Sequence, residues 1–136
     1  MFRYIYILGF FYILPSCINA QTGRFKLTGK VNHKGLKFLV LEYSSLNNNT
    51  RRDTIQLKNN KFKISGYLNH PGVGGLYGID KNGNASLRNF AQIFLEPTKM
   101  KLVITEGQFK YVNLKGSSMQ DMADSIKLLQ KPVNDF

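Results

Sequence analysis

The chain has 136 residues and a formal net charge of +11, with two histidines, one cysteine and no tryptophan. This length fits a single domain that is large enough to bury a hydrophobic core. A single cysteine excludes a disulfide framework and a Cys-x-x-Cys redox site within the chain. A basic surplus suits polyanions, but no motif that reads RNA or DNA is present.

The basic residues are spread over strand exteriors and do not form one block along the sequence. We therefore interpret the charge as a solvated basic surface, with attraction to an anionic envelope or polysaccharide as the alternative. No nucleic-acid partner is expected, because the next feature predicts export.

The first twenty residues have the layout of a secretory signal peptide. Arg3 gives the positive end, residues 4–14 are an uninterrupted apolar run, and the small residue Ala20 precedes Gln21. The run is about half of the ~20 residues that a membrane-spanning helix needs, so a permanent anchor is the weaker interpretation. We expect cleavage after Ala20, a single β domain of residues 21–136, and export of the mature protein.

Cys17 supports a second interpretation of the same segment. The arrangement Leu14-Pro15-Ser16-Cys17 resembles the lipobox of bacterial lipoproteins, in which the cysteine is lipidated and becomes the first residue. Pro15 fits that site poorly, so cleavage after Ala20 is favoured. A membrane partner is expected only if Cys17 is lipidated, and in the favoured case the mature protein has no thiol nucleophile.

Period-2 alternation is clearest in residues 52–68, where apolar and polar side chains take turns along two arms. Between the arms, Asn59-Asn60 tolerates the positive φ of a tight turn. We predict a hairpin here. Its register sets three pairs opposite one another: Lys58 and Lys61, Leu57 and Phe62, Ile55 and Ile64.

Further short strands, separated by turn signals, fill the rest of the domain. We predict strands at 25–31, 36–43, 73–80 and 111–115, a long loop over 81–89, and a second hairpin of 91–96 and 100–105 around Pro97-Thr98. Gly29 interrupts the apolar face of the first strand and is interpreted as a bulge. The fold class is all-β, an antiparallel β-sandwich or open barrel of about 7–8 strands with one C-terminal α-helix.

After Gly116 the apolar period becomes helical. The predicted helix spans residues 117–131, and Pro132 stops it. Ser117 with Gln120 fits a capping box, and Ser118 before Asp121 offers an alternative cap. Its apolar stripe consists of Met119, Met122, Ile126 and Leu129. Something must cover this stripe, either the domain's own sheet or a second chain, and methionine-rich stripes adapt well to partners. We take the stripe as the candidate partner-facing site.

No arrangement of residues predicts catalysis. His33 and His70 lie in predicted turns without metal-ligand partners at short spacing, and the acidic residues form no close pair in the sequence. Phosphate loops, dinucleotide fingerprints and nucleophile elbows are absent. We expect no enzyme activity, and no catalytic, cofactor-binding or metal-binding residues.

Four tyrosines would stack on sugars if they shared one exposed face: Tyr43, Tyr67, Tyr77 and Tyr111.

Several short motifs follow one another in a fixed order. They are Phe25-x-Leu27-x-Gly29, then Asp53-Thr54-Ile55-x-Leu57-x-Asn59-Asn60-Lys61-Phe62-x-Ile64-Ser65-Gly66, Phe94-Leu95-Glu96, Met100-Lys101-Leu102-x-Ile104 and Val112-x-Leu114-Lys115-Gly116-Ser117. Together they resemble a bacterial envelope family, domain of unknown function 4369, over nearly all of residues 25–129. In that family the domain follows a signal peptide and usually precedes a thioredoxin-like thiol–disulfide oxidoreductase domain. The catalytic Cys-x-x-Cys of such a domain is not in this chain.

The resemblance implies a non-enzymatic exported accessory or interaction module, similar to the N-terminal domain of those oxidoreductases. It also implies a place in the periplasm or cell envelope of a Gram-negative bacterium. Its implied partner is a thioredoxin-like envelope protein, or a second copy of itself. The alternatives are a stand-alone module that binds glycans or other envelope polymers, and a truncated remnant of a longer oxidoreductase. The sequence leaves the ligand, the partner and the oligomeric state open.

Overall fold

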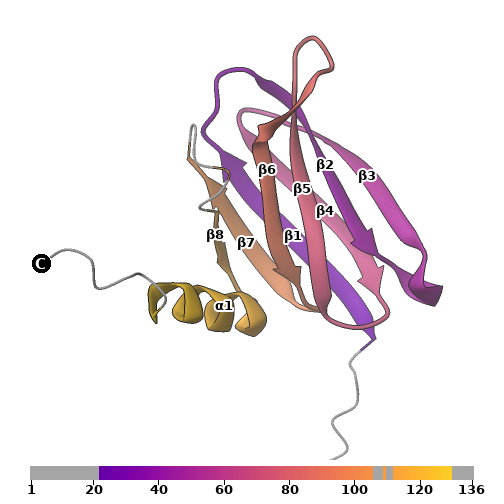
Figure 1. Cartoon of the computed structure of the whole chain (residues 1–136). Helices are drawn as coiled ribbons and strands as arrows, with labels where there is room; N and C mark the ends of the chain where they lie inside the picture. The colour runs from indigo at the N-terminus through magenta and orange to yellow at the C-terminus, as the bar shows by residue number, and fades with distance from the viewer. Residues whose placement is uncertain (1–21, 106–108, 110–111, 130–136) are drawn as a thin grey trace, which may run out of the picture.

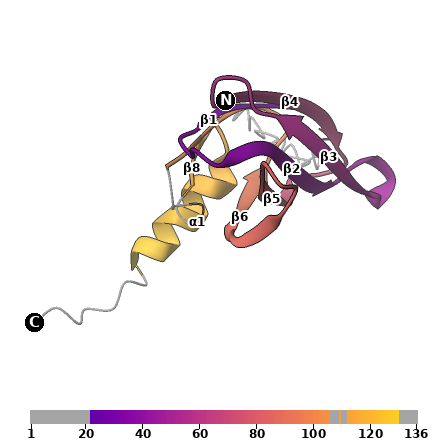
Figure 2. The same cartoon turned by 90° about the horizontal axis from the view of Figure 1, so that it is seen from above.

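Two four-stranded sheets packed face to face form the body of the protein, and one helix follows them (Figures 1 and 2). The structure is a computed structural model that describes residues 22–105, 109 and 112–129. Sheet A has the strand order β4-β1-β7-β8 and sheet B the order β3-β2-β5-β6. The chain therefore adopts the predicted sandwich of eight strands with a C-terminal helix, and it does not close into a barrel.

The strands of sheet A are β1 (Gly23–Val31), β4 (Lys61–Leu68), β7 (Lys99–Ile104) and β8 (Asn113–Lys115). Those of sheet B are β2 (Leu36–Ser44), β3 (Thr50–Gln56), β5 (Gly72–Asp80) and β6 (Ala85–Leu95). A 3-10 turn, η1 (Leu46–Asn48), joins β2 to β3, and the helix α1 covers Ser118–Leu129. Five of the six strand pairings are antiparallel, and β1 with β7 is parallel.

The hydrophobic core lies between the sheets, because inward and outward positions alternate along each strand. Sheet A contributes Phe25, Leu27, Phe62 and Leu102, and sheet B contributes Leu39, Leu41, Leu76 and Ile93, all of them buried. Each such side chain contributes about 1.5–3 kcal/mol by leaving water. Val40, between Leu39 and Leu41, is also buried, so β2 is covered on both faces.

The predicted turn at Asn59-Asn60 forms, with positive φ at both residues. Lys58 and Lys61 exchange two backbone hydrogen bonds across it, at 3.0 and 2.9 Å. Beyond this bridge the two arms separate, since β3 pairs with β2 in sheet B and β4 pairs with β1 in sheet A. The segment is therefore a corner between the sheets and not a hairpin.

The predicted pairing of the arms is wrong beyond Lys58 and Lys61. Ile55 stands opposite Leu39, and Phe62 stands opposite Gly29. The buried faces were predicted correctly, because Ile55 and Phe62 enter the same core from opposite sheets. Alternation specifies which face of a strand is buried, but it does not specify the neighbouring strand.

The second predicted hairpin, around Pro97-Thr98, is also a crossing between sheets. β6 ends in sheet B and β7 begins in sheet A. The carbonyl oxygen of Thr98 accepts a hydrogen bond from Lys26 N at 3.0 Å, where β7 enters beside β1. β7 then pairs with β1 in parallel, and the long connection that parallel neighbours need is here the chain from β2 to β6.

The hairpin that does form after β5 replaces the loop predicted over 81–89. β6 already begins at Ala85, and the chain turns at Asn82-Gly83. Oδ1 of Asp80 accepts hydrogen bonds from the backbone N–H groups of Asn82 and Asn84 at 2.8 and 2.9 Å. This side-chain-to-backbone bonding is the local chemistry of a tight turn, and it shortens the loop. The last strand is also shorter than predicted, 113–115, and Tyr111 lies outside the described residues.

Gly29 does not mark a bulge, contrary to prediction. Its strand keeps an unbroken register on both sides, with Phe62 of β4 and Leu102 of β7 opposite it. A side chain at this position would collide with the Leu102 carbonyl oxygen and the Phe62 ring. The glycine is therefore explained by close packing, the other common reason for a glycine within a strand.

Candidate functional site

The helix α1 begins at the edge of the sandwich and leads away from both sheets (Figures 1 and 2). The chain reaches it from β8, the edge strand of sheet A, and the helix also contacts β6, the edge strand of sheet B. Gly116 turns the chain between β8 and α1 with a φ of 87°. The described helix agrees with the predicted one, of which residues 130 and 131 lie outside the described residues.

Glu96, directly after β6, holds the first turn of α1. Its Oε1 accepts hydrogen bonds from Met119 N at 2.8 Å and from Ser118 Oγ at 2.9 Å, and its Oε2 accepts one from Ser118 N at 3.1 Å. Free N–H groups and a partial positive charge at a helix start favour such an anion. Burial raises the pKa of Glu96, but the hydrogen bonds from Met119 and Ser118 outweigh it, so the pKa lies below its ordinary value. The carboxylate is therefore ionised at neutral pH.

Of the two predicted caps, Ser117 is the one that forms, since its Oγ accepts a hydrogen bond from Gln120 N at 3.2 Å. Gln120 does not complete the predicted capping box. Its Oε1 instead accepts the N–H of Phe94 in β6 at 3.2 Å, and its Nε2 donates to Oδ1 of Asp124 at 3.0 Å. The second hydrogen bond of the capping box, from the Gln120 side chain back to Ser117, does not form because the edge strand β6 presents a backbone N–H that the glutamine side chain binds instead.

Glu96 is the anchoring residue that sequence reasoning missed. It lies 22 residues before Ser118, and a lone carboxylate after a strand carries no local sign of a helix cap. The one available signal was its position beside the buried strand end at Leu95, because a buried charge requires a partner.

The apolar stripe of α1 is exposed where the structure describes it. Met119 is 36% exposed, Met122 67% and Ile126 48%, and the side chain of Leu129 lies outside the described residues. Leu128, on another side of the helix, is 65% exposed. Packing of the whole stripe on the domain's own sheet, one of the two predicted alternatives, is not seen for Met122 and Ile126, which lie beyond the first turn that holds α1 to the sheets. Met119, in that first turn, is the least exposed of the three.

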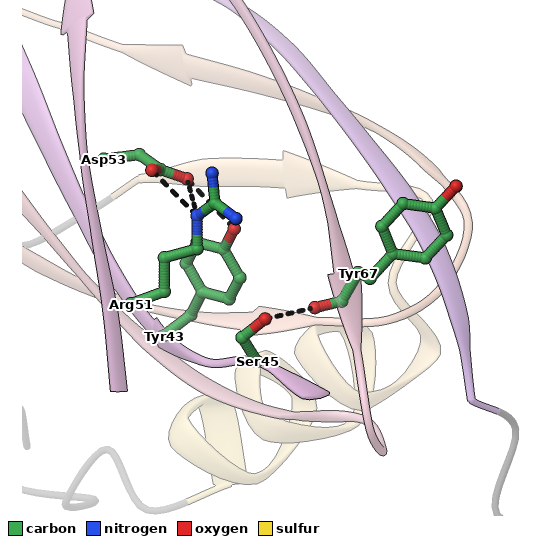
Figure 3. A network of polar contacts seen from close by, with 5 residues as sticks. All are labelled: Tyr43, Ser45, Arg51, Asp53 and Tyr67. Carbon is green, nitrogen blue, oxygen red and sulfur yellow. Dashed lines mark hydrogen bonds and ion pairs between the residues drawn. The ribbon is translucent and has the colours of Figure 1, made fainter. Parts of the chain in front are cut away.

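A second polar cluster joins β2, β3 and β4 (Figure 3). The Tyr43 hydroxyl donates to Oδ2 of Asp53 at 3.0 Å, and Arg51 Nε lies 3.0 and 3.1 Å from the two oxygens of the same carboxylate. Ser45 Oγ donates to the Tyr67 carbonyl oxygen at 3.3 Å. Burial and the hydrogen bond to Asp53 raise the pKa of Tyr43 to about 12. The ion-paired carboxylate of Asp53 and the protonated hydroxyl of Tyr43 therefore connect β3 to β2, and they do not form an acid–base pair.

The predicted sugar-stacking tyrosines do not share a face. Tyr43 is buried in the core, while Tyr67 points outward from sheet A and Tyr77 outward from sheet B. Tyr111 lies outside the described residues. The three described tyrosines therefore cannot form one stacking platform.

The histidines bond locally. Nδ1 of His33 accepts the N–H of Gly35 at 3.2 Å, and Nδ1 of His70 lies 3.1 Å from the Pro71 carbonyl oxygen. Within the described part of the chain, no three His, Cys, Asp or Glu side chains are placed to hold a metal ion.

The described part of the chain also contains no helix long and apolar enough to cross a membrane. Residues 1–20, with Cys17, lie outside it, so the signal peptide and the lipidation stay predictions.

A family model described as a domain of unknown function (DUF4369) matches residues 18–122. The chain belongs to the DUF4369 family. The DUF4369 match covers both sheets and the first turn of α1, including Glu96, Ser117 and Gln120. No curated protein and no solved structure matches the chain. The resemblance seen in the sequence is thus confirmed at the level of the family, while the association with thioredoxin-like domains stays a prediction.

Proposed function

We propose that this DUF4369 domain is a non-enzymatic interaction module that works after export, and that α1 is the element that binds its protein partner. The observation that carries the proposal is the contrast within α1. Its first turn is fixed to the sandwich through Glu96 and Gln120, while Met122 and Ile126 are exposed. A helix that only had to complete the fold would turn these side chains toward the sheets.

A protein groove is the surface that such a helix fits best. Helix-in-groove recognition uses apolar anchors spaced three or four residues apart, as Met122 and Ile126 are. Burial of each anchor would contribute about 1.5–3 kcal/mol. Because the first turn of α1 is already held in place, less conformational freedom is lost on binding than for a free helix.

A thioredoxin-like thiol–disulfide oxidoreductase is the partner that we favour, on the strength of the family resemblance. The only cysteine of this chain is Cys17, so any dithiol chemistry would have to come from that partner. A second copy of the domain is the alternative partner.

Isothermal titration calorimetry with a purified thioredoxin-like envelope protein tests the proposal. The double variant Met122→Ser/Ile126→Ser is expected to bind about tenfold more weakly or worse, because both anchors are truncated. Lys127→Gln, on the polar side of α1, is the matched control and should bind like the wild type. Equal affinity of the double variant and the wild type would contradict the proposal.

Light scattering on the wild type and on Ile126→Asp identifies the alternative partner. A wild-type dimer that becomes a folded monomer in the variant would show that the second chain is a copy of the first. A monomeric wild type with a variant that unfolds would place Ile126 in the core and exclude α1 as a docking element.

A further inference from the structure

The four strands of sheet A carry many basic residues and no acidic one. Three cations come from β1, two from β4, two from β7 and one from β8, eight in all. They are Arg24, Lys26, Lys30, Lys61, Lys63, Lys99, Lys101 and Lys115, and every one is exposed. Because the residues that alternate with them point into the core, these eight side chains gather on one outer face, which we call the basic face.

Like charges stand directly opposite one another on the basic face. In the register of the sheet, Lys30 is the partner of Lys61, Lys26 of Lys99, and Lys101 of Lys115. Directly opposed like charges destabilise a sheet. The arrangement therefore does not serve the stability of the fold and indicates a surface kept for an external anion.

None of the described carboxylates belongs to a strand of the basic face, although Asp53 of β3 lines a hollow that Lys63 and Ser65 also line. Glu42, Asp53 and Asp80 belong to strands of sheet B, Glu96 is bonded to α1, and Asp121 and Asp124 are on α1 itself. Asp53 is paired with Arg51 and Asp124 with Lys127. Within the described residues, the protein itself thus supplies no carboxylate from the strands of the basic face.

Two of the hollows on the basic face bring several cations together with neutral hydrogen-bonding groups. A hollow of about 510 Å³ is lined by Arg24, Lys26, Lys63 and Lys99 together with the hydroxyls of Ser65 and Thr98. A second, of about 320 Å³, is lined by Lys101, Lys115, Thr105 and Asn113. Lys99 and Lys101 are alternate residues of β7, only about 7 Å apart along the strand, so the two hollows are neighbours.

We propose that the basic face binds a linear acidic polysaccharide, whose chain extends across both hollows. Lysines act as point charges that attract the anionic groups, and Ser65, Thr98, Thr105 and Asn113 provide partners for sugar hydroxyls. Tyr67, opposite Arg24 at one end of the face and 53% exposed, offers a ring on which a sugar can stack. A flat anionic membrane would use neither the hollows nor the hydroxyl groups.

Binding of the purified protein to polygalacturonate, with neutral dextran as the uncharged comparison, tests this assignment. Affinity for polygalacturonate is expected to fall steeply between 50 and 200 mM salt, since polyanion binding releases condensed counterions. Lys26→Gln/Lys99→Gln should bind about tenfold more weakly or worse at the lower salt concentration, because it removes an opposed pair at the larger hollow. The Met122→Ser/Ile126→Ser variant should bind like the wild type, which separates this site from α1.

The matched control is Lys37→Gln/Lys81→Gln, which removes the same charge from exposed residues of sheet B and its turn. An equal loss of affinity in this control would show attraction by net charge alone and would overturn the proposal. Binding to vesicles of phosphatidylglycerol and phosphatidylcholine, with none to polygalacturonate, would overturn it in favour of a membrane surface. Absence of binding to polygalacturonate even at 50 mM salt would overturn it outright.

Discussion

The two sheets of this DUF4369 domain share one core but present contrasting outer faces. The outer face of sheet B carries Val40, Tyr77 and Phe90, with Val40 buried and the two rings 4.9 Å apart. On the same sheet Glu42 stands opposite Arg52, whereas on sheet A Lys26 stands opposite Lys99. Cross-strand pairs of the first kind stabilise a sheet and pairs of the second kind destabilise it. The comparison shows that sheet B is arranged for stability on both faces, and sheet A on its inner face only.

The largest expected effect is on the core that both sheets share. Phe62→Ala removes a buried ring that packs over Gly29, and it should lower the free energy of unfolding by about 3–5 kcal/mol. Lys63→Ala, the next residue on the outer face, should change it by less than about 0.5 kcal/mol. Urea unfolding of the two variants measures both. Equal losses would show that the inner and outer faces of β4 are assigned wrongly.

A smaller effect is expected where α1 joins the edge strands of the two sheets. Glu96→Gln weakens the cap on Ser118 and Met119 and should cost about 0.5–2 kcal/mol of local stability. Because the folded-state pKa of Glu96 is lowered from 4.5, this stability is complete above that value and is lost as the pH falls through the folded pKa. Hydrogen exchange of the α1 amides at pH 7 and below pH 4.5 measures it. Asp121→Asn is the control, and a matching effect in it would remove the special role of Glu96.

The next effect concerns a hydrogen bond within sheet B, from Tyr43 of β2 to Asp53 of β3. Tyr43→Phe loses the hydrogen bond to Asp53 and should lower stability by about 1 kcal/mol, while exposed Tyr67→Phe should have little effect. The pKa of Tyr43 is raised to about 12, so its contribution is complete below pH 10 and is lost as the pH rises through the folded pKa. Ultraviolet titration should show one late-ionising tyrosine that is missing from Tyr43→Phe and present in Tyr67→Phe.

The smallest expected effects distinguish the two outer faces most directly, because a substitution on each face should change the free energy of unfolding in opposite directions. Lys26→Gln relieves repulsion by Lys99 and should raise the free energy of unfolding by about 0.2–1 kcal/mol at low salt. Glu42→Gln removes the attraction to Arg52 on sheet B and should lower it by a similar amount. Both changes should shrink at 1 M salt, where charges are screened within about 3 Å. Thermal melts in which both variants move in the same direction would remove the contrast between the two outer faces.

Local patterns predicted the parts of this fold that depend on neighbouring residues. Alternation placed Ile55 and Phe62 in the core, asparagine chemistry predicted the turn at 59–60, and Ser117 was recognised as the helix cap. Each of these depends on the geometry of a few consecutive residues, because a strand shows its two faces in turn and asparagine tolerates positive φ. The apolar stripe of α1 was recognised for the same reason, although its exposure was not decided by the sequence.

What the tertiary structure decided is the assignment of each strand to its sheet. Two expected hairpins proved to be crossings, at Asn59-Asn60 and at Pro97-Thr98, because a compact turn can join strands of one sheet or of two. That choice depends on packing against distant strands, which local alternation does not encode. It brings β1, β4, β7 and β8 together and so gathers lysines that are scattered along the sequence onto one basic face. It also sets Glu96 beside a helix that begins 22 residues later, since a buried carboxylate takes the nearest free N–H groups in space and not in sequence.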